Sequence, residues 1–492
     1  MPQTKPTSEQ VTFLQAGTGA TQRTALAKLR DTVSVKDFGA VGDGVADDSA
    51  AVIAAIAYCN TNSRMLFVPA GRYKITQNID APVAPNNQFS FSIIGEGKHW
   101  QSVLYFTGAA VTTGLRLISA PGNYQYRGLF QEFMLYFDAG ATGGFTISYA
   151  HHPLVNSVCV RNTSPGGSGS AGITLDNCNA PSISNCLIAG CGSASKGALY
   201  VNRCTVAIIE KNYITGQTFA GIQIERGSAT TVCNAVESTG YLLLAGEESE
   251  SVFGVNLTSQ CDNLENPTGS YIRFGKGLTS GAANASTLDV SNSIGSPSGS
   301  TSINYAFDIG SVRSVDLRNN SFWGDTVATI ALTSASTNLR IARQIGLYKN
   351  PTVVPYITIG GTHLLQATAI GHLDISAGQY GLAIANQSIS VTTATINNAT
   401  VNGAGGLYSR LFLTTPAPTT VNNTLNYPVT SLSSFATGTE IIIIPNDSNL
   451  TIAHNAAGLG SFTLSGGVNL NLVASRAYRF LFNNSTGRWT QI

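Results

Sequence analysis

The chain has 492 residues, a formal net charge of +1 and 11% charged residues, against a usual share of about a quarter. A net charge near zero lacks the excess of basic residues that nucleic-acid binding requires. No apolar segment approaches the roughly eighteen residues that cross a bilayer. The polar start, MPQTKPTSEQ, does not match a secretory signal. We therefore expect no nucleic-acid partner and no membrane insertion.

The first distinctive segment runs from Val33 to Cys59 and is rich in acids: Asp37, Asp43, Asp47 and Asp48. Behind them lies an alanine-rich run with apolar residues at helical spacing, namely Val52, Ile53, Ile56 and Ala57. Acids just before a helix accept hydrogen bonds from its free first-turn N–H groups and suit the positive end of its dipole. We interpret these acids as a structural cap rather than as catalytic groups.

Strand-like phrases recur at a nearly constant interval through the middle of the chain. GITLD, GALYV and GIQIE begin at Gly172, Gly197 and Gly221, and each alternates apolar with other residues. Alternation of period two, ended by Asn and Gly, predicts short strands joined by turns. Strands that recur once per coil describe a stacked solenoid. The predicted fold class is therefore all-β, and the best match is a right-handed, single-stranded parallel β-helix.

The cysteines follow the same interval. Three pairs are separated by 26 to 28 residues: Cys159 and Cys186, Cys178 and Cys204, and Cys233 and Cys261. The chain has no CxxC pair and its histidines are scattered, so we expect no metal site and no cofactor. We interpret the cysteines as a small apolar residue recurring at one interior position, with disulfides possible only where the geometry suits them.

An open solenoid end exposes apolar core and unpaired strand edges. The helix after the acids, with the strand phrase RMLFVPAGRYKI at Arg64 to Ile75, is placed to cover the N-terminal end.

The acid-rich segment, with LFVPAGRYKI behind it, resembles the N-terminal signature of the pectate-lyase-like superfamily of β-helix proteins. The stretch from Val11 to Thr32 is similar to the linker of bacteriophage tailspikes, and Ile441 to Ile492 resembles their small all-β terminal module. Together these stretches cover about a quarter of the chain. The resemblance implies a homotrimer in the virion tail, made in the host cytoplasm, that binds and depolymerises bacterial surface polysaccharide.

The expected division of the chain combines this resemblance with the repeat. Residues 350–428 keep apolar runs but lose the coil period, as expected where three chains wrap one another. The N-terminus is expected to attach to the virion baseplate or to an adaptor protein. The five expected segments are a linker or anchor remnant at 1–32, a cap with the first coils at 33–100, the parallel β-helix at 101–349, an interwoven trimerising region at 350–428 and a C-terminal β module at 429–492.

Hydrolysis of a glycosidic bond needs two carboxyl groups, whose separation decides the stereochemistry. Asp176 and Glu225 end equivalent phrases and should point outward two coils apart, about 9 to 10 Å between backbones, which suits an inverting pair. Against this, the coil between them should present Leu199 and Val201 outward, which indicates a subunit interface.

Asp289 and Asp316 lie 27 residues apart and should stack on adjacent coils at about 5 Å, as in a retaining pair. The alternative is a carboxylate held by Arg313 or Arg318 in a solvated ladder. Glu210 should project from another face of the same coil as Glu225 and is a further catalytic candidate.

Several other residues are candidates for binding or elimination chemistry. Trp323 offers a flat face for a sugar ring or packs in a core, Asp325 could bond sugar hydroxyls, and Arg226 is the third substrate-binding candidate. Glu247, Glu248 and Glu250 form an acidic loop that is either an active-site wall or a solvated loop tip. His151 and His152 are candidates for a lyase base, and His454 and Asn455 are expected to stabilise the terminal module.

The sequence thus predicts a phage tailspike that cuts capsule or O-antigen by endo-glycosidic hydrolysis. Two alternatives stay open, a polysaccharide lyase on the same scaffold and a receptor-binding spike that grips glycan without cutting it.

Overall fold

A computed structural model describes most of the chain. The described residues are 5–82, 91–97, 100–119, 121, 124–138, 140–163, 170–217, 219–238, 240–247, 254–265, 267, 269–278, 285–296, 303–310, 312–322, 325–332, 338–342, 357–359, 362–363, 373–376, 389–390, 409–414, 418–421, 440–445, 447–456, 461–483 and 485–492. The chain forms two compact units. The first unit comprises Met1–Glu248, Val255–Tyr271 and Ile294–Thr301, and the second comprises Ser249–Gly254, Ile272–Ser293 and Ser302–Ile492.

The N-terminal elements precede the first coil. They are β1 (Thr12–Phe13), β2 (Arg23–Thr24), α1 (Ala25–Leu29), β3 (Val33–Ser34), the 3-10 helix η1 (Val35–Phe38), β4 (Asp43–Asp47) and α2 (Ser49–Thr61). Asp37 accepts from the Ser34 N–H in a capping box, and Asp43 accepts from two backbone N–H groups of its own loop. The acids are structural, as the sequence predicts.

Asp48 stabilises the entry loop rather than the helix itself. It is the N-cap residue of α2 but makes no side-chain cap bond. Its carboxylate instead accepts from the N–H groups of Val41 and Gly42, at 2.7 and 3.1 Å. The expected first-turn bond comes from Asp47, whose carboxylate accepts from the Ser49 N–H at 3.0 Å.

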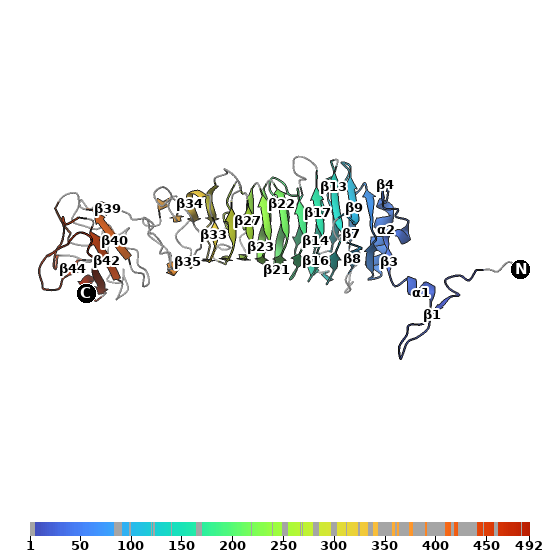
Figure 1. Cartoon of the computed structure of the whole chain (residues 1–492), viewed down its shortest axis with the longest axis horizontal. Helices are drawn as coiled ribbons and strands as arrows, with labels where there is room; N and C mark the ends of the chain where they lie inside the picture. Colours follow the sequence, from blue (N-terminus) through green and yellow to red (C-terminus); the bar gives the residue numbers. More distant parts are fainter. Residues whose placement is uncertain are drawn as a thin grey trace. The chain divides into compact units, whose positions relative to one another are not determined.

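Helix α2 covers the start of the coils. Its buried face consists of Val52, Ala55, Ile56 and Cys59, whereas Ala57 is exposed. It packs against β3, β5, β6 and β7, so it closes the N-terminal end of the solenoid (Figure 1).

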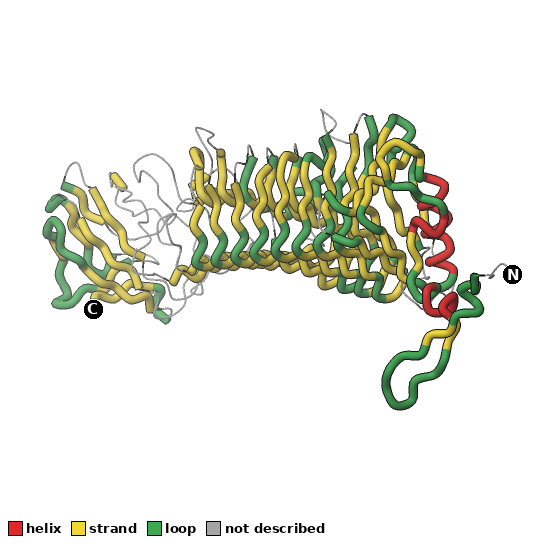
Figure 2. The backbone as a smooth tube through the Cα atoms, turned by 45° about the vertical axis from the view of Figure 1, so that its right-hand side comes forward, coloured by secondary structure: helices red, strands yellow, loops and turns green. Residues whose placement is uncertain are grey.

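The first unit is built from three series of short strands that pair in parallel with their counterparts one coil later (Figure 2). The first series is β7 (Ile79–Pro82), β10 (Gly114–Ile118), β14 (Gly144–Ser148), β18 (Ile173–Asp176), the first parts of β21 (Leu199–Glu210) and β23 (Ala220–Val232), and β25 (Tyr241–Ala245). The second is β5 (Met65–Val68), β8 (Ser92–Gly95), β12 (Leu129–Gln131), β16 (Leu154–Asn156), β19 (Ser182–Ser184), the later parts of β21 and β23, and β26 (Val255–Gln260).

The third series forms a separate parallel sheet. It is β4, β6 (Gly71–Ile75), β9 (Ser102–Thr107), β13 (Met134–Asp138), β17 (Cys159–Asn162), β20 (Leu187–Ala189), β22 (Tyr213–Gln217), β24 (Ala235–Ser238), β27 (Asn263–Glu265) and β30 (Ile294–Ser296). A short parallel pair, β11 (Gln125–Tyr126) and β15 (Ala150–His151), adds to the coils. This arrangement confirms the predicted all-β parallel solenoid.

The three glycine-led phrases lie side by side, with one shift of register. Ile173 pairs with Leu199, and Leu199 pairs with Ile222. Gly172 and Gly221 are therefore aligned with Ala198 rather than with Gly197. The extra residue belongs to the preceding turn, so a constant interval predicts the coil but not the exact residue.

The corners of the coils use left-handed backbone in register. Ser157, Asn185, Lys211, Cys233 and Cys261 form one corner column with φ between 52° and 54°. The N–H groups of the first four residues each donate to a carbonyl one coil later, for example Cys233 to Gln260 at 2.9 Å. A non-glycine residue in this region costs roughly 1–2 kcal/mol, and the bond between coils offsets that cost.

The cysteines occupy more than one kind of position. Cys178 donates its N–H to the Cys204 Sγ at 3.4 Å, so this pair stacks in the interior as expected. Cys159, however, pairs with Leu187 rather than with Cys186. The expectation of one interior position is wrong for Cys233 and Cys261, which are exposed in the corner column because their backbone turns them outward.

A buried polar ladder runs beside that column. The Asn212 N–H and side-chain amide both donate to the Asn234 Oδ1, and Asn234 donates in the same way to the Asp262 Oδ1. The other oxygen of Asp262 accepts from the Thr231 and Ser259 hydroxyls. Burial raises the pKa of Asp262, and these donors oppose the shift.

The second unit continues with parallel pairs and ends in a β module. Its strands are β28 (Ile272–Phe274), β29 (Thr287–Ser291), β31 (Ile303–Ile309), β32 (Ser314–Arg318), β33 (Ser321–Phe322), β34 (Asp325–Leu332), β35 (Asn338–Ala342), β36 (Ile357–Ile359), β37 (Thr362–His363), β38 (Leu373–Ser376), β39 (Ile389–Ser390), β40 (Ser409–Thr414), β41 (Thr419–Val421), β42 (Glu440–Pro445), β43 (Leu450–Ile452), β44 (Phe462–Thr463), β45 (Leu470–Asn471), β46 (Tyr478–Asn483) and β47 (Arg488–Gln491). Parallel pairing reaches β38, inside the segment expected to lose the coil period. The module has its own core around Phe462, Phe480 and Trp489.

Among the helices of the described residues, none combines the length and apolar character needed to span a membrane.

Replacement of Asp262 by Asn should stabilise the protein near neutral pH. The raised pKa means that the folded state binds a proton more strongly than the unfolded state, so ionisation of Asp262 lowers stability as pH rises. Asn keeps the ladder and removes the buried charge. We expect the thermal midpoint of Asp262→Asn to exceed that of the wild type by about 2 °C at pH 7.5 and by less at pH 4.

The control for this experiment is Asp80→Asn, at an exposed ion pair with Arg116. An Asp262→Asn midpoint below that of the wild type at pH 7.5 would mean that the four donors stabilise the carboxylate more than burial penalises it.

Candidate functional site

One outward column of the third strand series aligns aromatic, cationic and acidic side chains of the first unit. Inward residues of these strands, such as Leu135, Val160 and Ile188, are buried in the core. The alternate residues point outward, one per coil and in register. We name this column the outer lane: Lys74, Tyr105, Tyr136, Arg161, Ala189, Thr215, Glu237 and Glu265.

Two carboxylates stack at one end of the outer lane. Glu237 pairs in register with Glu265 on the next coil, and adjacent parallel strands lie about 4.8 Å apart. The Glu237 carboxylate accepts from the Tyr213 hydroxyl at 3.1 Å and from the Thr215 hydroxyl at 3.3 Å. Glu265 accepts from the Asn263 amide at 2.9 Å. Neither carboxylate forms an ion pair with a described cation.

Tyr213 stays protonated beside this pair. Burial is the largest cause that raises its pKa, followed by its hydrogen bond to Glu237 and the charges of Glu237 and Glu265. The phenol therefore acts as a donor that orients Glu237, and its ring remains 42% exposed.

Aromatic rings gather at the other end of the outer lane. The Trp100 ring lies 5.3 Å from that of Tyr136, which lies 5.7 Å from that of Tyr105. Trp100 is 58% exposed, so much of this residue is open to solvent. We name Trp100, Tyr105 and Tyr136 the aromatic platform. Tyr105 and Tyr136 pack against a small apolar cluster formed by Val103, Met134 and Cys159.

Two arginines flank the aromatic platform. The Arg72 guanidinium lies 3.7 Å from the Tyr105 ring centre, and that of Arg161 lies 5.7 Å from the Trp100 ring centre. Such cation–π contacts hold the rings and leave donors at their edge. Four coils separate Tyr136 from Glu237 in the pairing register, which corresponds to roughly 19 Å.

Asp176 and Glu225 occupy equivalent positions, as predicted, but do not form an open pair. Asn202 lies between them in register, and its amide donates to Asp176 at 2.8 Å. The expectation that Leu199 and Val201 face outward is wrong, because the register shift places both in the core.

Glu225 is fully buried. Its carboxylate accepts from the Gln223 amide and from the Glu247 N–H, both at 2.9 Å. Of the acidic loop, Glu248 and Glu250 lie outside the described residues.

Asp289 and Asp316 stack on adjacent coils, which confirms that prediction. Arg318 joins them: its Nη2 donates to Asp289 at 2.6 Å, and its Nε lies 3.3 Å from the Asp316 carboxylate. The geometry favours the alternative of a ladder held by arginine over a catalytic pair.

The remaining candidates are scattered. Glu210 pairs with Ser184 and Val232, and Glu225 comes before Val232 in the chain, so Glu225 lies less than one coil after Glu210. Arg226 is 8% exposed, at a left-handed corner. Trp323 lies outside the described residues, as does the side chain of Asp325 in β34.

His151 and His152 lie away from the outer lane in the pairing register. His151 packs against Tyr124 at 4.4 Å, and burial, then the charge of His152, lowers its pKa. In the C-terminal module, His454 accepts from the Leu464 N–H at 3.0 Å and contacts Asn455. Both residues of that pair therefore support the module locally.

Glu237, Glu265 and Trp100 were missed by the sequence reasoning. The available signal is the 28-residue interval: Glu237 and Glu265 each follow by four positions the cysteines Cys233 and Cys261, which have the same spacing. Glu237 lies in β24 and Glu265 in β27, and both strands are too short for alternation to show which residues face outward.

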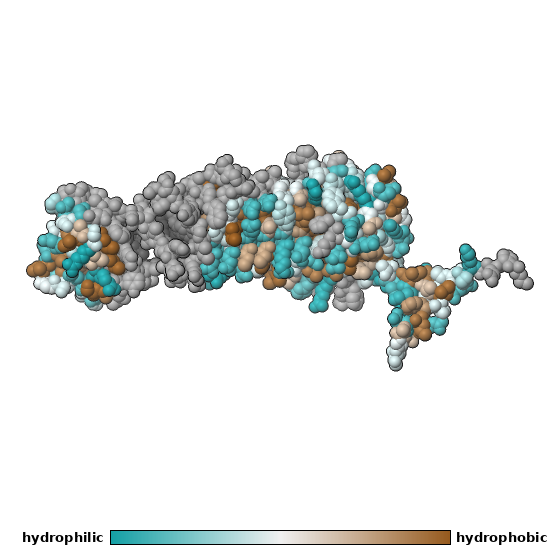
Figure 3. Space-filling model, in the orientation of Figure 1, coloured by the Kyte–Doolittle hydropathy of each residue, from teal (hydrophilic) through white to brown (hydrophobic). Residues whose placement is uncertain are grey.

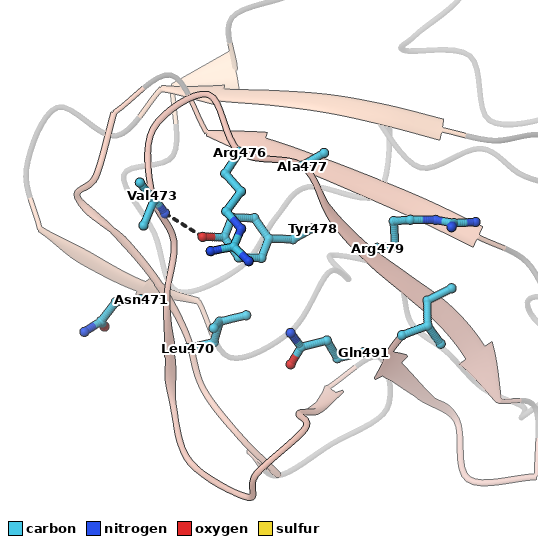
Figure 4. A pocket seen from close by; sticks show the side chains of 9 residues that line it. Leu470, Asn471, Val473, Arg476, Ala477, Tyr478, Arg479 and Gln491 are labelled. Carbon is cyan, nitrogen blue, oxygen red and sulfur yellow. Dashed lines mark hydrogen bonds between the residues drawn. The ribbon is translucent and has the colours of Figure 1, made fainter.

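A hollow of about 300 Å³ occurs in the C-terminal module (Figure 4). In Figure 4, Arg476 and Tyr478 lie close together, and the Tyr478 hydroxyl accepts from the Val473 N–H at 2.8 Å. The described residues that line this hollow include no Asp or Glu. Among the described residues, no group of three or more His, Cys, Asp or Glu could hold a metal ion.

Comparison with known families agrees with this architecture. Residues 32–264 match the family model "Rhamnogalacturonase A/epimerase, pectate lyase-like". The matched segment covers a little less than half of the chain. It includes the aromatic platform and Glu237, whereas Glu265 falls just beyond its end. No curated protein matches the chain.

Solved structures with a similar fold include phage tailspikes. Tailspike protein 3 of bacteriophage CBA120 is 14% identical over 98% of this chain and 73% of its own, with a TM-score of 0.43. A tailspike mutant of E. coli bacteriophage HK620, in complex with a pentasaccharide, is 14% identical to this chain. The match covers 91% of this chain and 85% of the tailspike, with a TM-score of 0.48. The Azotobacter vinelandii mannuronan C-5 epimerase A-module is also 14% identical. That match covers 70% of this chain and 97% of the module, with a TM-score of 0.44. At this identity the likenesses assign no function to this chain.

Proposed function

We propose that this chain is a phage tailspike that binds bacterial surface polysaccharide, capsule or O-antigen, and depolymerises it by endo-glycosidic hydrolysis. The observation that supports this most is the outer lane, in which a pair of carboxylates without an ion pair to any described cation shares one face with an exposed aromatic platform. Carboxyl pairs cleave glycosidic bonds, and aromatic rings bind the apolar faces of sugars.

Glu237 and Glu265 are the proposed catalytic pair. Carboxyl groups about 5 Å apart suit a retaining mechanism. Glu237, held by the Tyr213 and Thr215 hydroxyls, would attack the anomeric carbon, while Glu265 protonates the leaving oxygen. Glu265 would then take a proton from the water that releases the glycosyl group from Glu237.

The aromatic platform would bind sugar rings several units away from the bond that is cut. Arg72 and Arg161 add cationic donors at its edge, which would favour a repeat unit that carries a carboxylate or other anionic substituent. A polymer lying along the outer lane would thus contact both ends, as an endo-acting enzyme requires.

A homotrimer is also proposed, with attachment to the virion tail through the N-terminal segment. Exposed apolar residues gather on the second strand series: Leu154, Val206 and Ile208 are 37%, 61% and 43% exposed. On the face of the first unit drawn in Figure 3, by contrast, hydrophilic side chains predominate and hydrophobic ones form small separate patches. Apolar side chains clustered on one surface indicate a protein interface.

Substitution of the proposed catalytic pair should abolish cleavage without unfolding the protein. We expect Glu237→Gln and Glu265→Gln each to lower kcat by about 10²- to 10⁴-fold, measured as reducing ends released from purified capsule. Asp289→Asn and Asp316→Asn are matched controls on the other stacked pair and should stay within about twofold of wild type, a range below general acid–base effects. The reverse pattern would place the chemistry at Asp289 and Asp316.

The same assay separates the alternatives. Products that absorb as unsaturated uronic acids would identify a lyase. Binding with no release of reducing ends by the wild type would identify a receptor-binding spike.

Removal of the Trp100 ring should weaken polymer binding but leave the chemistry unchanged. We expect Trp100→Ala to raise KM about tenfold, since one aromatic contact is worth roughly 1 kcal/mol beyond its buried area, with kcat nearly constant. Tyr124→Ala, at a ring that packs on His151 instead, is the control. An unchanged KM for Trp100→Ala would remove the aromatic platform from the site.

Charges placed on the apolar surface of the second strand series should disrupt the trimer. Val206→Asp with Ile208→Asp buries two carboxylates in the proposed interface, so we expect light scattering to report monomers in place of trimers. Val45→Asp, at a residue 75% exposed on the N-terminal cap, is the matched control. A monomeric wild type would contradict the proposal directly.

A further inference from the structure

Cys233 and Cys261 are exposed thiols on adjacent coils, at matching positions. The residues on either side of them pair in register, Val232 with Gln260 and Ala235 with Asn263. The Cys233 N–H also donates to the Gln260 carbonyl, at 2.9 Å. The two cysteines therefore lie one above the other in the corner column.

The backbone aims both side chains in the same direction. Their φ angles are 52° and 54°, so the two Cα–Cβ bonds are nearly parallel. Stacked coils place the Cα atoms about 4.8 Å apart, inside the range of about 4.4–6.8 Å found for disulfides. The Cβ atoms need only a small approach to reach the separation of about 3.5–4.5 Å that a disulfide requires.

The other six cysteines are buried, so this exposed pair is chemically distinct among the eight. Burial raises the pKa values of Cys159, Cys186 and Cys191 to about 12, which leaves them almost entirely as unreactive thiols. The pKa of Cys233 is also raised, first by burial and then by Cys261, so its reaction should be faster in mildly alkaline solution.

We propose that Cys233 and Cys261 are a modification site at which a low-molecular-weight disulfide, such as oxidised glutathione, forms a disulfide between the two coils. One protein thiolate attacks a sulfur of the reagent and displaces one thiolate. The second protein thiolate attacks the mixed disulfide and displaces the other. Two protein thiols are oxidised, the reagent is reduced to two thiols, and the two protons pass to the displaced thiolates.

The disulfide would fasten the coils that carry the proposed catalytic pair. Glu237 and Glu265 each lie four residues after one of the cysteines, so the bond would fix the coil spacing next to them. This consequence rests on the proposed function, whereas the oxidation itself does not.

The test treats the full-length protein with oxidised glutathione at pH 8.5, then blocks free thiols with N-ethylmaleimide under denaturing conditions. Mass spectrometry should show six labelled cysteines, no retained glutathione and a peptide pair that joins Cys233 to Cys261. Thermal unfolding of the oxidised protein should shift to higher temperature, and the shift should disappear on reduction. Cys233→Ser, as control, should keep a stable glutathione adduct on Cys261 and show no such shift.

Two results would overturn the proposal. One is stable glutathione on both cysteines of the wild type, which would show that the thiols do not meet. The other is a disulfide found only between chains. Activity is measured separately, as the fraction retained after heating, so inactive wild type with a normal Cys233–Cys261 bond would count against the proposed function alone.

Discussion

Backbone hydrogen bonding between successive coils is the constraint on which the other features depend. Corner residues with left-handed backbone donate their N–H groups to the coil beyond them, as Ser157 and Asn185 do. This pairing fixes every side chain about 4.8 Å from its counterpart on the next coil. Chemistry in this protein is therefore organised in columns rather than in loops that converge from distant parts of the chain.

A column of acids must be compensated, and the protein does this in different ways. Arg318 contacts both Asp289 and Asp316, Asn202 donates to Asp176, and Asp262 receives hydrogen bonds from a buried ladder. Among the described residues, the donors to Glu237 and Glu265 are hydroxyl and amide groups, and no described cation pairs with either carboxylate. This difference from Asp289 and Asp316 is the reason for placing the proposed chemistry at Glu237 and Glu265.

The interval of the repeat predicts how far apart residues lie along the solenoid, and that part succeeded. Asp289 does stack on Asp316, and Asp176 and Glu225 are two coils apart. The interval does not predict which groups reach a side chain. Loop conformation places the Glu247 backbone against Glu225, and the side-chain rotamer of Arg318 brings it to both aspartates. One extra residue in a turn places Leu199 in the core, where the interval alone predicts it on the surface.

The same geometry limits which glycosidic mechanisms the scaffold can support. Carboxyl groups in one column are separated by whole numbers of coils, about 5 Å for neighbours and about 10 Å for the next position. The first distance suits attack on the sugar by one carboxylate, and the second leaves room for a water molecule. Moving a glutamate by a single coil would therefore change the stereochemical outcome without altering the fold. If the proposed hydrolysis holds, the number of coils between the two carboxylates would decide its stereochemical outcome, and Glu237 with Glu265 is a one-coil pair.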